Sequence, residues 1–118
     1  MERNWQRIEY RRGMLADDAK SEDLPADVWV SPDIPKEVLE ALERENVLEL
    51  RGCYGDPDLA DPVQYDHLVV TTSKDAAEIL VFNRAVMLFV ANDERLRRIH
   101  RIMVSLDLAA RDDGTDEK

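Results

Sequence analysis

The chain has 118 residues and a formal net charge of −10, and 36% of its residues are charged. A chain of this length can form one domain with its own core, while its acidic field disfavours binding to nucleic acid or anionic lipid. One cysteine cannot form an internal disulfide, and the basic N-terminus lacks the apolar segment of a signal peptide. We therefore expect a single globular domain over residues 1–110 in a cytoplasmic protein with no membrane span.

The first thirty residues predict two strands separated by a loop. Alternation in residues 1–12 favours a strand that ends at Gly13, although a short helix there is an alternative. Residues 14–27 are acidic and poor in large apolar groups, which is typical of a mobile loop. VWV at 28–30 predicts a second short strand.

The next segment predicts a helix, a strand and a loop. Pro35 suits the first turn of a helix over residues 35–45, whose buried stripe is Val38, Leu39 and Leu42. Alternation in VLELRG, residues 47–52, predicts a strand that ends at Gly52. Turn-forming residues predict a loop over 53–63.

Three apolar runs follow, over residues 65–72, 77–82 and 85–90, and together they predict a three-strand meander. The competing interpretation of residues 75–91 is one buried helix capped by Thr72. The β-branched and aromatic residues, with the polar pair Asn83-Arg84 between the runs, favour a hairpin.

The clearest helix covers residues 93–109. Asn92 can cap it, and Leu96, Ile99, Met103, Leu106 and Ala110 share one face. Residues 111–118 predict a disordered acidic tail. The order of elements predicts an α+β fold, an antiparallel sheet packed by two helices. In that order alone, strand, helix, sheet and helix, the chain resembles small cytosolic protein inhibitors of metalloproteases of the emfourin type.

Four arginines and a histidine in ten residues make the last helix a candidate interaction surface. Asp93 precedes Arg97 by four residues and Glu94 precedes Arg98 by four, which predicts ion pairs along the helix. A solvated, ion-paired face is the simpler interpretation. If this face binds a partner, we expect Arg97, Arg98 and Arg101 to make the contacts.

Two other groups of residues are candidate sites. Tyr65, His67 and His100 could line a pocket between the sheet and the last helix, although no catalytic motif surrounds either histidine. The acidic run Asp56, Asp58 and Asp61 either forms turns or recognises a partner. Its prolines and its glycine position do not fit a calcium loop, and no zinc or phosphate-binding motif is present.

The leading hypothesis is a non-enzymatic interaction or regulatory protein that binds another protein or a second copy of itself, without cofactor or metal. The alternatives are a small enzyme or ligand-binding protein with the histidine pocket, and an inhibitor or nucleic-acid mimic that uses the acidic surface.

Overall fold

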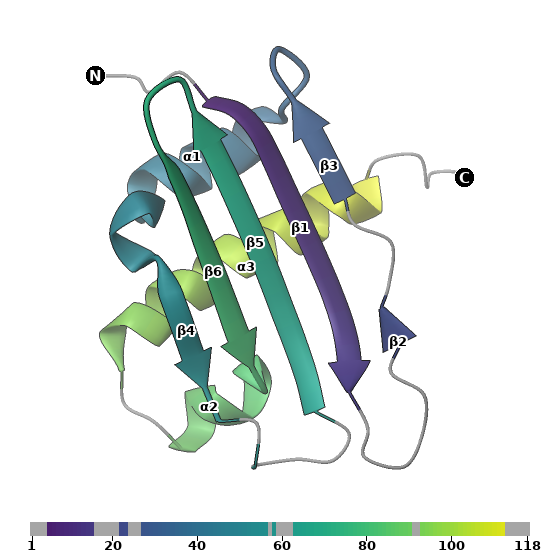
Figure 1. Ribbon diagram of the computed structural model, residues 1–118, viewed down its shortest axis with the longest axis vertical. Coiled ribbons are helices and arrows are strands. Elements are labelled where there is room, and N and C mark those ends of the chain that lie inside the picture. The colour runs from purple at the N-terminus through teal and green to yellow at the C-terminus, as the bar shows by residue number, and fades with distance from the viewer. Residues whose placement is uncertain are drawn as a thin grey trace.

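The computed structural model describes residues 5–15, 22–23, 27–56, 58, 63–90 and 93–112. It has an α+β fold in which helices cover one face of a mixed sheet (Figure 1). The α+β class is therefore confirmed, but the purely antiparallel sheet and the count of two helices are wrong.

The centre of the sheet is antiparallel. Its strand order is β2-β1-β5-β6-β4, with β3 also paired to β1. The long strands are β1 (Trp5–Leu15), β5 (Val63–Thr72) and β6 (Ala76–Phe82), and the short ones are β2 (Glu22–Asp23), β3 (Asp27–Val30) and β4 (Gly52–Gly55). The strands expected at 28–30, 65–72 and 77–82 are present. β1 confirms a strand in the described part of residues 1–12, but it continues through Gly13, where the strand was expected to end. The segment expected as a loop at 14–27 contains strand residues, because Met14 and Leu15 continue β1, Glu22–Asp23 form β2 and Asp27 begins β3; residues 16–21 and 24–26 lie outside the described part of the chain.

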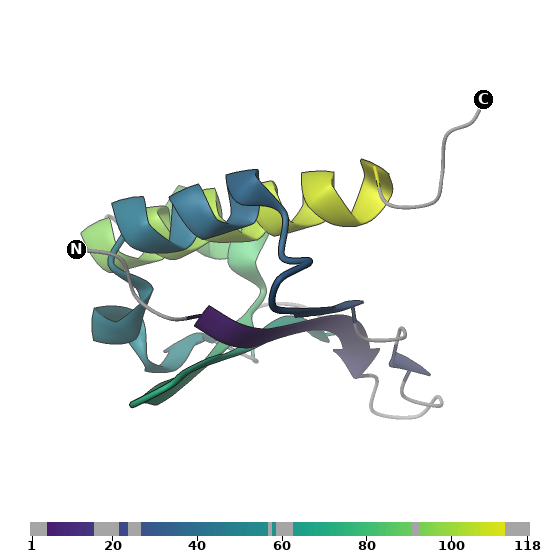
Figure 2. The same cartoon turned by 90° about the horizontal axis from the view of Figure 1, so that it is seen from above.

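The two expected helices are present as α1 (Lys36–Arg44) and α3 (Glu94–Asp112), and they lie side by side over one face of the sheet (Figure 2). Helix α3 runs two residues into the expected tail, and residues 113–118 lie outside the described part of the chain. The predicted stripe of α3 is largely buried, and Ile102 and Ala109 join it in the core.

The segment around residue 50 differs from the prediction. Val47–Leu50 form a 3₁₀ turn, η1, in which Val47 and Leu50 are buried three residues apart. That spacing fits a helix with three residues per turn rather than a strand. The turn begins at Asn46, whose φ is 54°, and β4 follows it inside the expected loop.

The third strand of the predicted meander is a helix, α2 (Arg84–Val90). The described part of residues 75–91 is therefore neither a hairpin nor one helix, but β6 followed by α2. Asn83 ends β6 with a φ of 53°, and its carbonyl accepts the Met87 amide. The edge that a third antiparallel strand would need is occupied by β4, which pairs with β6 in parallel.

The sheet has a covered face and an open face. On β5, Asp66, Leu68 and Val70 are buried beneath the helices. Because strand side chains alternate, Tyr65, His67 and Val69 lie on the opposite face. We call that opposite face the open face, since Figure 2 shows α1 and α3 on the other side of the sheet.

Candidate functional site

Two arginines of α3, Arg98 and Arg101, bind the residue that follows α1. Arg101 donates from Nε and Nη2 to the Glu45 carboxylate at 2.9 and 3.1 Å. Arg98 donates to the Glu45 carbonyl and lies 3.6 Å from Glu49. The Glu45 side chain is buried, and the hydrogen bond from Arg101 is the main cause that lowers its pKa. Arg98 and Arg101 therefore tie α3 to the end of α1.

The acidic residues at the start of α3 make contacts that differ from the predicted ion pairs. Asp93 caps the helix, because its carboxylate accepts the amides of Arg95 and Leu96. Glu94 contacts Arg97 at 3.7 Å and Arg101 at 3.6 Å. The expected Glu94–Arg98 pair is replaced by the contacts of Arg98 with Glu45 and Glu49.

The structure separates the residues of the predicted histidine pocket. His67 lies on the open face and its Nε2 is 2.6 Å from Glu78 Oε2. Tyr65 lies on the same face, and its ring crosses Gly13, where an added Cβ would come within 2.5 Å of the ring. His100 projects from α3 on the covered side, where its Nδ1 is 2.9 Å from Arg84 Nη1. His67 and His100 therefore lie on opposite sides of the sheet and do not line one pocket.

A polar network that the sequence analysis did not find surrounds Arg84 on the covered face. Arg84 donates to Asp66 at 2.8 Å from Nε, and its Nη2 lies 3.5 Å from Asp107. The single phenolic proton of Tyr10 is shared between Asp66 at 2.9 Å and Asp107 at 3.0 Å. Burial and then the two carboxylates raise the pKa of Tyr10, so the phenol stays protonated.

The protonation of His100 follows from its contact with Arg84. A guanidinium only donates, so His100 Nδ1 accepts and the ring proton is on Nε2. Burial and the charge of Arg84 lower the pKa of His100. Burial alone would lower the pKa of Arg84, but the hydrogen bond and charge of Asp66 outweigh it and raise that pKa. The network therefore contains a permanent cation and a neutral imidazole.

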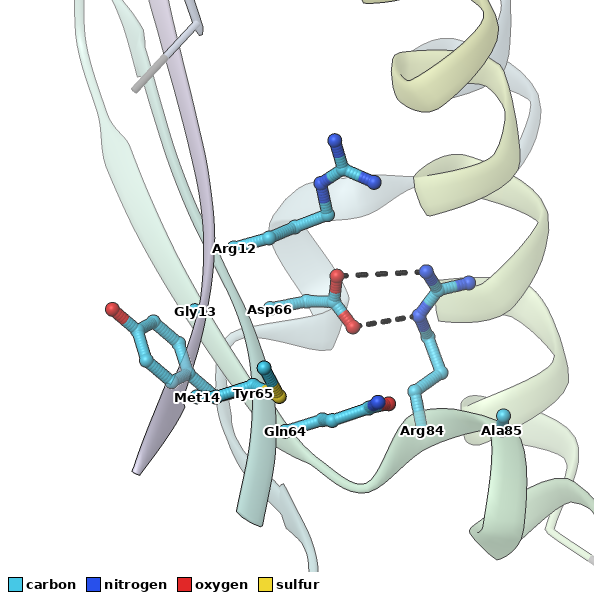
Figure 3. Close-up of a pocket in the computed structure, with 8 residues that line it drawn as sticks. All are labelled: Arg12, Gly13, Met14, Gln64, Tyr65, Asp66, Arg84 and Ala85. Atoms are coloured by element: carbon cyan, nitrogen blue, oxygen red, sulfur yellow. Dashed lines mark hydrogen bonds and ion pairs between the residues drawn. The ribbon is translucent and has the colours of Figure 1, made fainter. Parts of the chain in front are cut away.

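A cavity of about 310 Å³ opens beside this network, between the ends of β1 and β5 and the start of α2. Figure 3 shows Asp66 and Arg84 meeting at its wall, while the Tyr65 ring points to the other side of the strands. Met14 and Ala85 add apolar lining. Its volume is at the lower limit for small-molecule sites.

The acidic loop lies at the start of α2. The Asp56 carbonyl accepts a hydrogen bond from Asn83 Nδ2 at 2.7 Å, and the Asp56 carboxylate accepts the Asp58 amide at 2.9 Å. The second contact is the turn-forming role that short acidic side chains take in loops. Asp61 lies outside the described residues.

Helix α2 exposes an apolar surface beside this loop. Phe89 is 92% exposed and Val86 is 39% exposed, while Met87 on the other side of α2 packs against the core. We call Ala85, Val86 and Phe89, with Asp56 and Asp58, the α2 surface.

The described residues contain no group of three or more acidic, histidine or cysteine side chains placed to hold a metal ion. None of the helices in that part of the chain is long and apolar enough to cross a membrane. No protein-family model, curated protein or solved structure matches the chain in the three comparisons made.

Proposed function

We propose that this protein is a non-enzymatic interaction protein that binds another protein through the α2 surface. The exposure of Phe89 is the observation that carries the proposal. A large aromatic side chain at 92% exposure leaves apolar area in water that a partner can remove. Phe89 and Val86 are three residues apart, so they project from one side of the helix.

The shape and charge of the α2 surface support one kind of partner. A projecting phenylalanine requires a concave apolar pocket. Asp56 and Asp58 lie at the start of the same helix, and the whole chain carries a net charge of −10. Complementary potential therefore favours a partner with basic side chains around its pocket.

The contribution of Phe89 to binding can be estimated from the apolar surface area that a partner would bury. Full burial of a phenylalanine side chain contributes about 2 kcal/mol, which corresponds to roughly a thirtyfold change in Kd. Phe89→Ser should weaken binding by about that factor and leave the fold intact, because the side chain makes little contact with its own protein.

The test is affinity capture with three purified baits: wild type, Phe89→Ser and Leu108→Ser. Leu108 is the matched control, because it is an exposed apolar residue on α3 and lies about 20 Å along that helix from its start. The proposal requires that the wild-type and Leu108→Ser baits retain the same protein and that the Phe89→Ser bait does not. Moderate salt should release this protein from the baits that retain it. Identical retention by all three baits would contradict it.

An inhibitor is one form of this proposal, in which the pocket that receives Phe89 belongs to an enzyme. Activity assays of the captured protein, with and without the chain, would test that form. A nucleic-acid mimic has less support, because Glu9, Glu45 and Glu94 are paired with arginines and do not form a row of free carboxylates.

A small-molecule binding protein is a second candidate, favoured by the cavity beside Asp66 and Arg84. Met14→Trp would fill that cavity from its rim. Binding of a compound from a library screened by protein NMR, with shifts confined to the cavity residues and lost in Met14→Trp, would support this candidate. Shifts that persist in the variant would refute it.

A further inference from the structure

The open face has a regular arrangement of side chains that follows from the strand registers. Glu9 pairs with Val69, which pairs with Glu78. In the next row, Arg11 pairs with His67, which pairs with Leu80 on β6 and then with Cys53 on β4. Val28 and Val30 extend the face onto β3, where they are 43% and 50% exposed.

The charges on this face are balanced, unlike those of the chain. It carries two arginines, Arg7 and Arg11, and two glutamates, Glu9 and Glu78, whereas the whole chain carries a net charge of −10. Two acidic molecules repel each other over most of their surfaces. The open face is where two copies can approach without that repulsion, and its half-buried apolar residues Val69 and Leu80 gain from being covered.

We propose that two copies of this chain form a dimer through their open faces, related by a twofold axis that crosses the strands between Glu9 and Arg11. Under that symmetry Glu9 faces the partner's Arg11, and Arg11 faces the partner's Glu9, so one ion pair forms twice. On β5, His67 faces the partner's Val69. A twofold axis along the strands would instead place Glu9 over the partner's Glu78, which like-charge repulsion opposes.

The state of Arg11 in the single chain supports this pairing. Its one ion pair among the described residues is a 4.0 Å contact between Nη2 and Glu9 Oε2. Its Nε is buried and has no hydrogen-bond partner within the same described part of the chain. The side chain as a whole is 42% exposed, so a carboxylate from the partner can reach the Nη atoms and give the guanidinium a second acceptor.

This dimer goes beyond the proposed function and does not depend on it. Arg84 at the start of α2 projects toward Asp66 on the covered side of the sheet, so α2 lies on that side. The α2 surface would therefore remain accessible in the dimer.

The test is a concentration series by analytical ultracentrifugation on the full chain and four variants. Wild type should be dimeric at micromolar concentration. Glu9→Arg and Arg11→Glu should each raise the dimer Kd about tenfold or more, because each places like charges opposite one another. The double variant Glu9→Arg/Arg11→Glu should restore dimerisation, because the exchanged charges again face their opposites. Lys36→Glu, on exposed α1, is the control and should dimerise like wild type.

Cys53 provides an independent measurement, because it is exposed on β4 in the same row as Arg11 and Leu80. Its alkylation should slow as wild type is concentrated, and should not slow in the two single variants. A wild-type chain that stays monomeric, a dimer that both single variants retain, or a double variant that fails to restore association would each overturn the proposal.

Discussion

Removing the charge of Asp66 should cost more stability than removing any exposed charge in this protein. Asp66→Asn keeps the shape of the side chain but weakens its bonds with Arg84 and Tyr10. The Arg84 and Asp66 side chains are only 14% and 10% exposed, so water replaces little of what is lost.

The size of the effect follows from what remains beside Arg84. Breaking a buried ion pair by removing one partner typically costs about 3–5 kcal/mol. Here Asp107 stays 3.5 Å from Arg84 Nη2, so the guanidinium keeps one carboxylate. We therefore expect a loss of about 2–3 kcal/mol in the free energy of unfolding. For a domain of this size, that loss lowers Tm by roughly 10 °C.

Urea unfolding followed by tryptophan fluorescence would measure this loss, because Trp5 and Trp29 are both buried in the core. A double-mutant cycle with Arg84→Met should give a coupling energy of at least about 1.5 kcal/mol. Glu40→Gln, in the exposed pair with Lys36, should change stability by no more than about 0.5 kcal/mol. Two results would refute the view that these residues act as one buried unit. One is a loss below about 1 kcal/mol in the free energy of unfolding of Asp66→Asn, and the other is a double variant whose loss equals the sum of the losses in the two single variants.

Three further predictions concern other parts of the fold. The pKa of His100 is lowered in the folded protein, so the stability contributed by its neutral form should be fully present above the ordinary histidine pKa of about 6.5 and be lost as the pH drops below it. His100→Gln should flatten this pH dependence of the free energy of unfolding, measured by urea unfolding at pH 5–8. Gly55→Ala should detach β4, because Gly55 has a φ of 88° and the added Cβ would lie 2.1 Å from a backbone oxygen; unchanged amide hydrogen exchange in β4 would argue against this. Arg98→Glu/Arg101→Glu should lower Tm in a thermal melt, since both arginines are bound to Glu45; an unchanged Tm would mean that these bonds contribute little.

Local patterns predicted most of the elements correctly. The stripe containing Leu96, Ile99 and Met103 identified α3, and alternation identified β1 and β5. The errors arose where a tertiary contact decided the outcome. AVMLFV has the composition of a strand, but β4 occupies the edge that this strand would need. Asn46 and Asn83, each with a positive φ, precede the two segments that were predicted as strands and are helical.

The buried network could not be predicted because its members are far apart in the sequence. Tyr10, Asp66, Arg84 and Asp107 come from four different elements. The pairing of β1 with β5 brings Tyr10 to Asp66, and the packing of α2 and α3 on the sheet adds Arg84 and Asp107. One signal was available, since Asp66 alternates with Leu68 and Val70 on the buried face of β5. A carboxylate in that position implies a buried cation.

The position of β1 has a consequence for the order in which the chain can fold. β1 comes first in the sequence, but its longest partner is β5, and Trp5 pairs with Thr72 while Leu15 pairs with Val63. These contacts join residues about fifty to seventy positions apart, which slows folding because a long loop must close first. During synthesis, the apolar side of β1, which carries Ile8 and Tyr10, therefore stays uncovered until both β5 and the later α3 can pack against it. This topology delays closure of the core until α3 has been synthesised, so the core does not form progressively from β1 onward.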